Sequence, residues 1–333
     1  TPIAKHSETS HTLTPAPARQ LLWGDTHLHT TNSADAFAFG ARLTPEDALR
    51  FARGEAVTST TGIPAQLKRP LDFLMIADHG EGLGMSRQIL EGNPALVSDP
   101  TVARWSELMK NGGDDAAQAA GELISSFAAG KLPPVLRDRA ILAPIFRSVW
   151  EDHNKTVDSF NEPGVFTAFI GYEYTALDIG DNLHRVVMFR DGADKANQVL
   201  PFPATVSINP ENLWNALAAY EEKTGGKILA IPHNSNLSNG QMFAFSDVEG
   251  NTIDADYAAK SARWNDRGMR LPASPCAAPM CRWWMPKTAK KPRRQNTCWP
   301  LARARCWGPC GVRFAGMLQR SKRHWRRRNR VGR

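Results

Sequence analysis

Two histidines stand two residues apart near the start of the sequence, His27 and His29 in the segment GDTHLHT. Side chains two residues apart on a β-strand point to the same side of the sheet. The pair therefore presents two imidazole rings together, which is a natural chelate for a transition metal. The apolar residues before the pair indicate that it ends a buried strand, where βα-barrels build their sites. On its own, an HxH pair is as readily structural as functional.

Other ionisable side chains share this placement at an end of a strand-like segment. They are Asp78 and His79 after the run 71–77, Glu173 in the run 165–174, His184 at the start of the run 184–190, and His233 after the run 227–231. An acid between apolar and aromatic neighbours, as in the segment GYEY, is costly to bury unless it meets a cation. A lone histidine at a strand end is more often a satisfied loop residue. Histidines at several successive strand ends instead indicate one shared site.

The elements that must position these groups alternate between short strand-like runs and helical stretches. This alternation is typical of βα units packed around a mostly parallel sheet. Helices are expected at 44–53, where Thr44 caps the first turn, and at 210–223. Longer helical stretches within about residues 99–162 predict a helical insertion beside the barrel.

Charge and cysteine content divide the chain into a body and a tail. Residues 1–262 carry 21 Lys and Arg against 32 Asp and Glu, whereas residues 263–333 carry 20 against 1. All five cysteines lie in the tail, so neither a disulfide framework nor thiol catalysis belongs to the body. We therefore predict three regions, namely a leader at 1–20, a folded body at 21–262 and an irregular basic tail at 263–333.

The tail is rich in Trp, Cys, Arg and Pro and has no helical or strand periodicity. A solvated basic tail usually carries Lys, Ser and Gly instead. We therefore hypothesise that the tail results from a frameshift between about residues 257 and 265. A sensible βα continuation in another frame of the coding DNA would support this idea, and its absence would contradict it. The competing interpretation is a genuine tail that binds nucleic acid or an anionic membrane surface.

The leader is polar, contains Pro15 and Pro17, and begins with Thr. It is typical of the new end left when a signal peptide is removed, so we expect a periplasmic or secreted location rather than a cytoplasmic one. No run of about 18 apolar residues occurs, and no membrane-spanning helix is expected.

The order of these motifs resembles the PHP (polymerase and histidinol phosphatase) superfamily. The segments GDTHLHT, IADHGEGLGMS, FIGYEYT, HRVVMFR and IPHNSNLSNGQMF are closer still to a bacterial branch known as DUF3604. The resemblance covers roughly residues 27–257 and rests on five motifs in order. It implies a distorted (β/α)7 barrel that holds two or three divalent metal ions, often Zn, Mn or Fe, and hydrolyses phosphoesters.

The resemblance also implies a role for each residue. The first metal is assigned to His27 and His29, the bridge to Glu173, the second metal to His184 and His233, and the third to Asp35 and His79, with Asp78 as a neighbouring ligand or orienter. Asp25 is expected to orient one of the histidines. Arg185 is a candidate to hold anionic oxygens of the substrate, and Asn234 to bond the substrate or orient His233. Both also fit ordinary structural roles.

One motif of the family is missing. The PHP pattern ends with Asp-x-His near the C-terminus, and no Asp-x-His follows His233. The gap falls in the region of unusual composition, which agrees with the frameshift hypothesis. A site without these two ligands should bind metal more weakly.

Three functions remain open at this stage. The first is a phosphoesterase acting on a monoester, a diester or an organophosphorus triester, in which the metals share and activate a water molecule. The second is a metal-dependent hydrolase of an amide, a lactone or a sulfate ester, since activated water attacks many electrophiles. The third is a nonenzymatic binder that uses the basic tail. It predicts steeply salt-dependent binding that is lost when the chain is truncated near Arg263.

Overall fold

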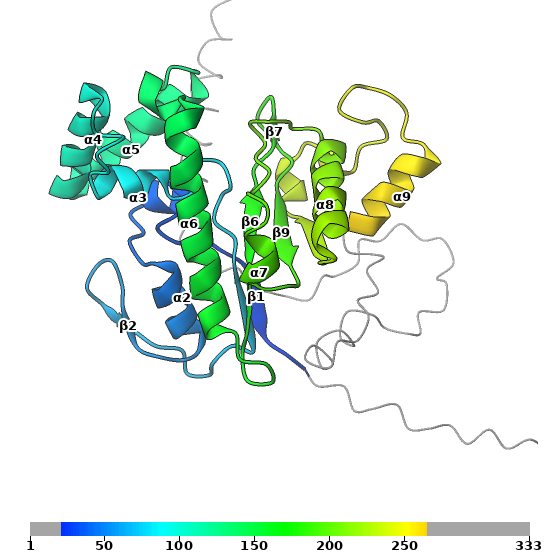
Figure 1. The fold of residues 1–333 in the computed structure, drawn as a ribbon, viewed down its shortest axis with the longest axis horizontal. Coiled ribbons are helices and arrows are strands. Elements are labelled where there is room, and N and C mark those ends of the chain that lie inside the picture. The colour runs from blue at the N-terminus through cyan, green and yellow to red at the C-terminus, as the bar shows by residue number, and fades with distance from the viewer. Residues whose placement is uncertain (1–20, 265–333) are drawn as a thin grey trace, which may run out of the picture. The chain divides into compact units, whose positions relative to one another are not determined.

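The computed structural model describes residues 21–264 (Figure 1). The predicted leader and the predicted tail beyond Trp264 lie outside the described residues, as do the expectations of a frameshift, of export and of tail-mediated binding. Within residues 21–264, no helix is both long enough and apolar enough to cross a membrane.

The strands form two small sheets and two short hairpins. They are β1 (Gly24–Leu28), β2 (Val57–Thr58), β3 (Pro64–Ala65), β4 (Phe73–Ile76), β5 (Thr167–Phe169), β6 (Gly171–Tyr174), β7 (Leu177–Asp178), β8 (Asp181–Asn182), β9 (Arg185–Phe189) and β10 (Ile228–Pro232). One sheet has the order β1-β4-β5 and the other the order β10-β9-β6, while β2 pairs with β3 and β7 with β8. A parallel bridge between His79 and Glu173 links the two sheets where their ionisable residues lie.

The direction of the strands differs from the expected parallel arrangement in the second sheet. β1, β4 and β5 are parallel, but β9 is antiparallel to both β6 and β10. The connection from β6 to β9 contains only the hairpin β7–β8 and no helix. A parallel return needs a longer crossover, usually helical, so the short connection favours the antiparallel pairing. The pairings of the described strands do not close into a barrel, and the predicted (β/α)7 barrel stays a prediction.

The two faces of these sheets have different partners. On the outer face, Tyr172, Val187 and Phe189 belong to the main apolar core together with Trp150 of α6 and Trp214 of α8. The inner face carries a smaller apolar cluster, formed by Met75, Ala77, Val186, Met188 and Leu229. β6 and β4 approach closely at Gly171, where an added Cβ would lie 2.0 Å from the side chain of Met75. Only glycine fits there.

Helices cover the outer face and build a separate cluster beside it (Figure 1). They are α1 (Ala34–Ala38), α2 (Pro45–Ala52), α3 (Met85–Leu90), α4 (Pro100–Asn111), α5 (Gly113–Ala128), α6 (Arg139–Phe160), α7 (Ala193–Ala196), α8 (Pro210–Thr224) and α9 (Ala255–Trp264), with the 3-10 turns η1 (Pro134–Leu136), η2 (Ser235–Leu237) and η3 (Gln241–Phe243). Thr44 caps α2 through a reciprocal capping box with Asp47, as its sequence position predicts.

The region of the predicted insertion has two parts. α4 and α5 pack with α1 and α3 around an apolar cluster of their own, which includes Trp105 and Met109. In contrast, α6 places Val149, Trp150 and Val157 in the main core. The second half of α6 therefore belongs to the layer that covers the sheet, because its apolar residues face Tyr172 and Phe189.

Candidate metal centre

The strand directions bring the predicted ligands to a single edge. His27 lies in β1 and His29 just after it, while His79 follows β4 and Glu173 lies in β6. Because β9 is antiparallel to β6, its first residues lie at the edge where β6 ends, and the end of β10 lies there as well. His184, just before β9, and His233, just after β10, therefore join the same edge. The register between β1 and β4 is irregular between Asp25 and Leu28, the kind of distortion that re-aims side chains near sites.

Period-two alternation places these side chains on the inner face. His79 follows Met75 and Ala77 at intervals of two residues, and His184 precedes Val186 and Met188 in the same way. Those apolar residues form the inner cluster. The candidate ligands thus lie directly above an apolar layer, which holds their side chains and limits the access of water from below.

Glu173 is the centre of the cluster, and its side chain is only 2% exposed. Its Oε1 lies 2.5 Å from His184 Nδ1 and 2.8 Å from His233 Nε2. Its Oε2 lies 2.9 Å from both His27 Nε2 and His29 Nε2. Four imidazole nitrogens thus surround one carboxylate.

Two groups of three side chains have the geometry of a cation site. His27, Glu173 and His233 form one group, and His29, His79 and Glu173 form the other. In each group the ligand atoms lie within 4.8 Å of one another. Both groups share Glu173, the residue to which the PHP resemblance assigns the bridge. Imidazole and carboxylate ligands suit Zn, Mn and Fe.

Asp35 lies at the rim of this cluster, between two histidines. Its Oδ1 is 3.3 Å from His29 Nδ1 and its Oδ2 is 3.4 Å from His79 Nε2. It belongs to neither of the two groups of three. The structure thus brings Asp35 and His79 together, and the third metal to which the resemblance assigns them stays a prediction.

The charges of the cluster are strongly coupled. Burial raises the pKa of Glu173, but hydrogen bonds from His184, His233, His27 and His29 hold it well below its usual range. Burial lowers the pKa of His29, but hydrogen bonds and charges from Asp35 and Glu173 raise it to about 10. Burial also lowers the pKa of His233, which keeps this ring in the neutral form that binds metal. The carboxylates therefore remain ionised. The imidazoles around them cannot all be protonated at once, because their positive charges would repel one another.

A contact between the rings of His27 and His29 tests whether this set fits a metal. Their Nε2 atoms lie 2.9 Å apart, and both face the same oxygen of Glu173. Without a metal, one of the two rings must carry an extra proton to bond Glu173, in agreement with the raised pKa of His29, since two protonated rings would repel each other. A divalent cation can take the place of that proton between the imidazole nitrogens and the carboxylate, so the residues present fit a metal.

Two hydroxyl groups, which the sequence patterns did not single out, set the direction of the rings. Ser33 Oγ donates to Asp35 and lies 2.7 Å from His29 Nδ1. Since the hydroxyl hydrogen is already used, His29 Nδ1 donates to Ser33, and its Nε2 is the nitrogen that faces Glu173. Thr175 Oγ1, which donates to a backbone carbonyl, lies 2.5 Å from His79 Nδ1 in the same manner. Outer partners of this kind fix the ring orientation at metal sites. Their only sequence signal is a position within a few residues of a ligand.

The expected orienting roles of Asp78 and Asp25 differ in the structure. Asp78 is buried, and its two oxygens accept from the backbone N–H and the hydroxyl of Thr30 at 2.5 and 2.7 Å. It therefore anchors the loop after β1 and bonds no ring of the cluster. Asp25 accepts from the backbone N–H of His27 and does not contact the ring.

Arg185 does not face the cluster, which corrects its predicted role in substrate binding. It follows His184 directly on β9 and pairs with Tyr174, so alternation turns it to the outer face. Its guanidinium is buried there and donates to the carbonyl of Leu183. Burial lowers the pKa of this group. Adjacent residues on a strand point to opposite faces of the sheet, so the sequence alone could have predicted that Arg185 faces away from His184.

Asn234 follows His233 in a left-handed conformation, with φ of 55°. Its side chain is exposed and makes no hydrogen bond with the residues that the structure describes. It lies beside the cluster without orienting His233, and its predicted contact with substrate stays a prediction.

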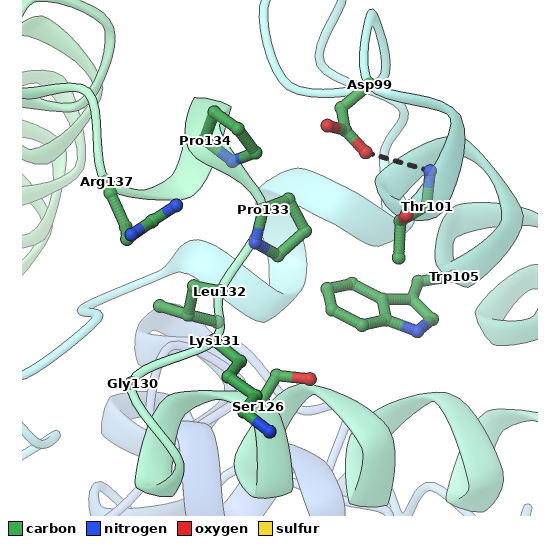
Figure 2. A pocket seen from close by; sticks show the side chains of 10 residues that line it. All are labelled: Asp99, Thr101, Trp105, Ser126, Gly130, Lys131, Leu132, Pro133, Pro134 and Arg137. Atoms are coloured by element: carbon green, nitrogen blue, oxygen red, sulfur yellow. Dashed lines mark hydrogen bonds between the residues drawn. The ribbon is translucent and has the colours of Figure 1, made fainter.

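A cavity of about 500 Å³ lies elsewhere, between α4, α5 and η1 (Figure 2). Its wall includes Trp105, Lys131 and Arg137, together with Asp99, whose side chain caps α4. None of the candidate metal ligands lines it. Trp105 is almost fully buried, so its ring belongs to the core of the helical cluster.

The chain belongs to the family described as a protein of unknown function, DUF3604, whose model matches residues 16–267. The matched segment contains every candidate ligand of the cluster. No curated protein and no solved structure matches the chain. These comparisons do not link the chain to the wider PHP superfamily, so a function of the PHP type is a proposal.

Proposed function

We propose that the chain is a metal-dependent hydrolase of the PHP type, with a phosphoester as the favoured substrate. The observation that carries this proposal is the buried Glu173 carboxylate, which is surrounded by imidazole nitrogens of His27, His29, His184 and His233. A purely structural carboxylate does not need four histidines, whereas a bridge between two cations does.

Divalent ions held here would activate a water molecule and stabilise the charge that develops on the oxygens of an ester. The residues of the chain supply the position of these ions. Glu173 would be the bridge, since it belongs both to the group with His27 and His233 and to the group with His29 and His79. His184 contacts the same carboxylate at its Oε1. Ser33 and Thr175 orient two of the rings, and the bond between Thr30 and Asp78 holds the loop that carries His29.

The proposal includes the PHP-type barrel. Two features of the described strands support it. An apolar cluster fills the inner face of the sheets, and helices α2, α6 and α8 pack against the outer face. Polar ligands at the carboxyl ends of parallel strands, above such a filled interior, are typical of barrel enzymes.

Metal analysis of the purified full chain tests the proposal. We expect two or more equivalents of Zn, Mn or Fe and turnover of a chromogenic phosphoester. Glu173→Gln should reduce the metal content to less than one equivalent, because the bridge loses its charge. Glu162→Gln is the matched control, since Glu162 is an exposed acid paired with Arg53. A wild-type chain without metal, or a Glu173→Gln variant with unchanged metal content, would contradict the proposal. Turnover of an amide, a lactone or a sulfate ester alone would correct the substrate class.

A further inference from the structure

The hairpin β7–β8 carries an apolar residue in an unfavourable backbone conformation. Ile179 has φ of 48°, and Gly180 after it has φ of 93°. Two successive positive φ values are typical of a tight hairpin turn that favours Asn-Gly. A β-branched residue is rare in this region and strained. The side chain of Ile179 is also fully exposed, so packing within the described residues does not explain its presence.

Other large apolar side chains are exposed next to this hairpin. They are Leu177 on β7 and Leu237, Phe243 and Phe245 in and after the turns η2 and η3. β8 contacts both η2 and η3, and these two turns contact each other. We call this set the apolar rim, defined as Leu177, Ile179, Leu237, Phe243 and Phe245.

Two residues of the apolar rim lie close along the chain to ligands of the candidate metal centre. Leu177 lies four residues after Glu173, and Leu237 lies four residues after His233. At about 3.3 Å per residue, four residues span at most about 13 Å. In addition, Thr175, at the base of the hairpin, contacts the ring of His79. A group bound on the rim is thus within reach of a reacting bond at the cluster.

The charges of the segments that carry the rim favour an uncharged partner over an anionic one. Residues 175–184 and 233–254 contain no Lys or Arg, but they contain Asp178, Asp181, Asp247, Glu249 and Asp254. Among the described residues, the ion pairs of the cluster join only histidines with Glu173 or Asp35. Arg185, the nearest cation in sequence, is buried on the outer face. Among the residues that the structure describes, the segments that carry the rim therefore offer a dianionic phosphomonoester no Lys or Arg.

We propose that the apolar rim binds the uncharged, apolar part of the substrate, and that the cluster acts on a neutral ester with bulky alkyl or aryl groups. This inference rests on the proposed hydrolase function and specifies its substrate class. Ile179 is the specificity-determining residue, since it lies at the tip of the hairpin with its whole side chain available for contact.

The test compares Ile179→Asn with wild type in the metal-loaded full chain. Asn-Gly is the preferred sequence of this turn, so we expect the variant to fold at least as well. The substrates are the dimethyl and dibutyl p-nitrophenyl phosphates, which are neutral, and the charged p-nitrophenyl phosphate. Ile63→Asn is the matched control, since Ile63 is an exposed isoleucine in the loop that joins β2 and β3.

Wild type should favour the dibutyl ester. Ile179→Asn should lower kcat/KM for this ester about tenfold, the effect expected from the loss of one buried isoleucine contact. It should change kcat/KM for the dimethyl ester less than about twofold, and metal content not at all. Equal effects on the short and long esters, or a wild-type preference for the charged monoester, would overturn the proposal. The Ile63→Asn variant should match wild type, and a loss as large as that of Ile179→Asn would overturn it too.

A binding measurement separates this proposal from the hydrolase function. The neutral fluorescent probe N-phenyl-1-naphthylamine should bind wild type about tenfold more tightly than Ile179→Asn, whether or not metal is present. A wild-type chain that holds no metal and hydrolyses no ester, but binds the probe in this way, would disprove the hydrolase and retain the apolar binding surface. Equal affinities for the probe would disprove the surface.

Discussion

The inner and outer faces of the sheets differ in the partners of their buried polar side chains. On the inner edge, each candidate ligand histidine lies within 3.6 Å of a carboxylate oxygen of Glu173 or Asp35. On the outer side, His153 of α6 stacks on Trp150. Among residues 21–264, neither ring nitrogen of His153 has a hydrogen-bond partner, and the buried Arg185 pairs with no carboxylate. His153 is more deeply buried than the cluster histidines, so neither the residue type nor burial marks the site. The cluster histidines differ from His153 because they converge on shared acids.

The comparison is sharpest between His184 and Arg185, which are neighbours in sequence on opposite faces. Replacing His184 by Ala should lower metal affinity by more than about a hundredfold, because a direct ligand is worth more than the outer partners, whose loss costs 10- to 100-fold. Isothermal titration of the metal-free protein with Zn or Mn measures this. An unchanged affinity would remove His184 from the centre.

His153 provides a prediction about pH on the outer face. Burial lowers the pKa of its ring to about 4, so the unfolded chain takes up a proton before the folded chain does. The stabilising effect of a neutral His153 is complete above pH of about 6.5 and is lost as the pH falls towards 4, by about 3 kcal/mol. Denaturant unfolding of wild type and His153→Phe at several pH values measures the difference. Phe retains the stack on Trp150, so an identical pH dependence in both proteins would contradict the prediction.

Ser33 tests whether the inner edge depends on partners behind the ligands. Ser33→Ala removes the acceptor of the His29 Nδ1 hydrogen, and the ring is then free to change its tautomer and orientation. We expect a 10- to 100-fold loss of metal affinity, measured by titration. Ser98→Ala is the control, since Ser98 is an exposed serine in the loop before α4 whose hydroxyl donates only to a backbone carbonyl. Equal affinities in the two variants would mean that Ser33 does not orient His29.

Arg185→Met should have the smallest effect, and it should stabilise the protein, whereas the changes to His184 and Ser33 should weaken metal binding. Replacing a buried, unpaired cation by an apolar side chain of similar length should raise the free energy of unfolding by about 1 to 2 kcal/mol and leave metal content unchanged. Chemical denaturation and metal analysis measure the two effects. Loss of metal in this variant would place Arg185 in the centre and break the contrast between the faces.

Much of the candidate site is predictable from the sequence, because its ligands lie at strand ends. His27, His29, His79, Glu173 and His233 are each found in or next to an apolar strand-like run, and the structure brings them together. The membership in DUF3604 is likewise confirmed by the match over residues 16–267. The strand positions follow from apolar runs, which depend on local sequence alone.

Two further features follow from sequence rules that the prediction did not apply. The short connection after β6 favours the antiparallel direction of β9, and alternation along β9 turns Arg185 outward. Other features depend on contacts that no local pattern contains. Ser33 and Thr175 are ordinary residues until the fold places them behind His29 and His79. Asp78 is the opposite example. Its position next to His79 predicted a role at the metal site, but in the structure both of its oxygens accept hydrogen bonds from Thr30.

Glu173 connects the first and last strands of the described fold. His27 comes from β1 and His233 from the end of β10, and both contact the same carboxylate. A chain emerging from the ribosome cannot assemble these contacts until almost the whole body has been synthesised. Bound cations would then link His27 to His233 late in folding. The chain segment between these residues is long, so closing it has a high entropic cost. Metal uptake would accordingly report the completion of folding, and chelators should accelerate unfolding of the sheet as a whole.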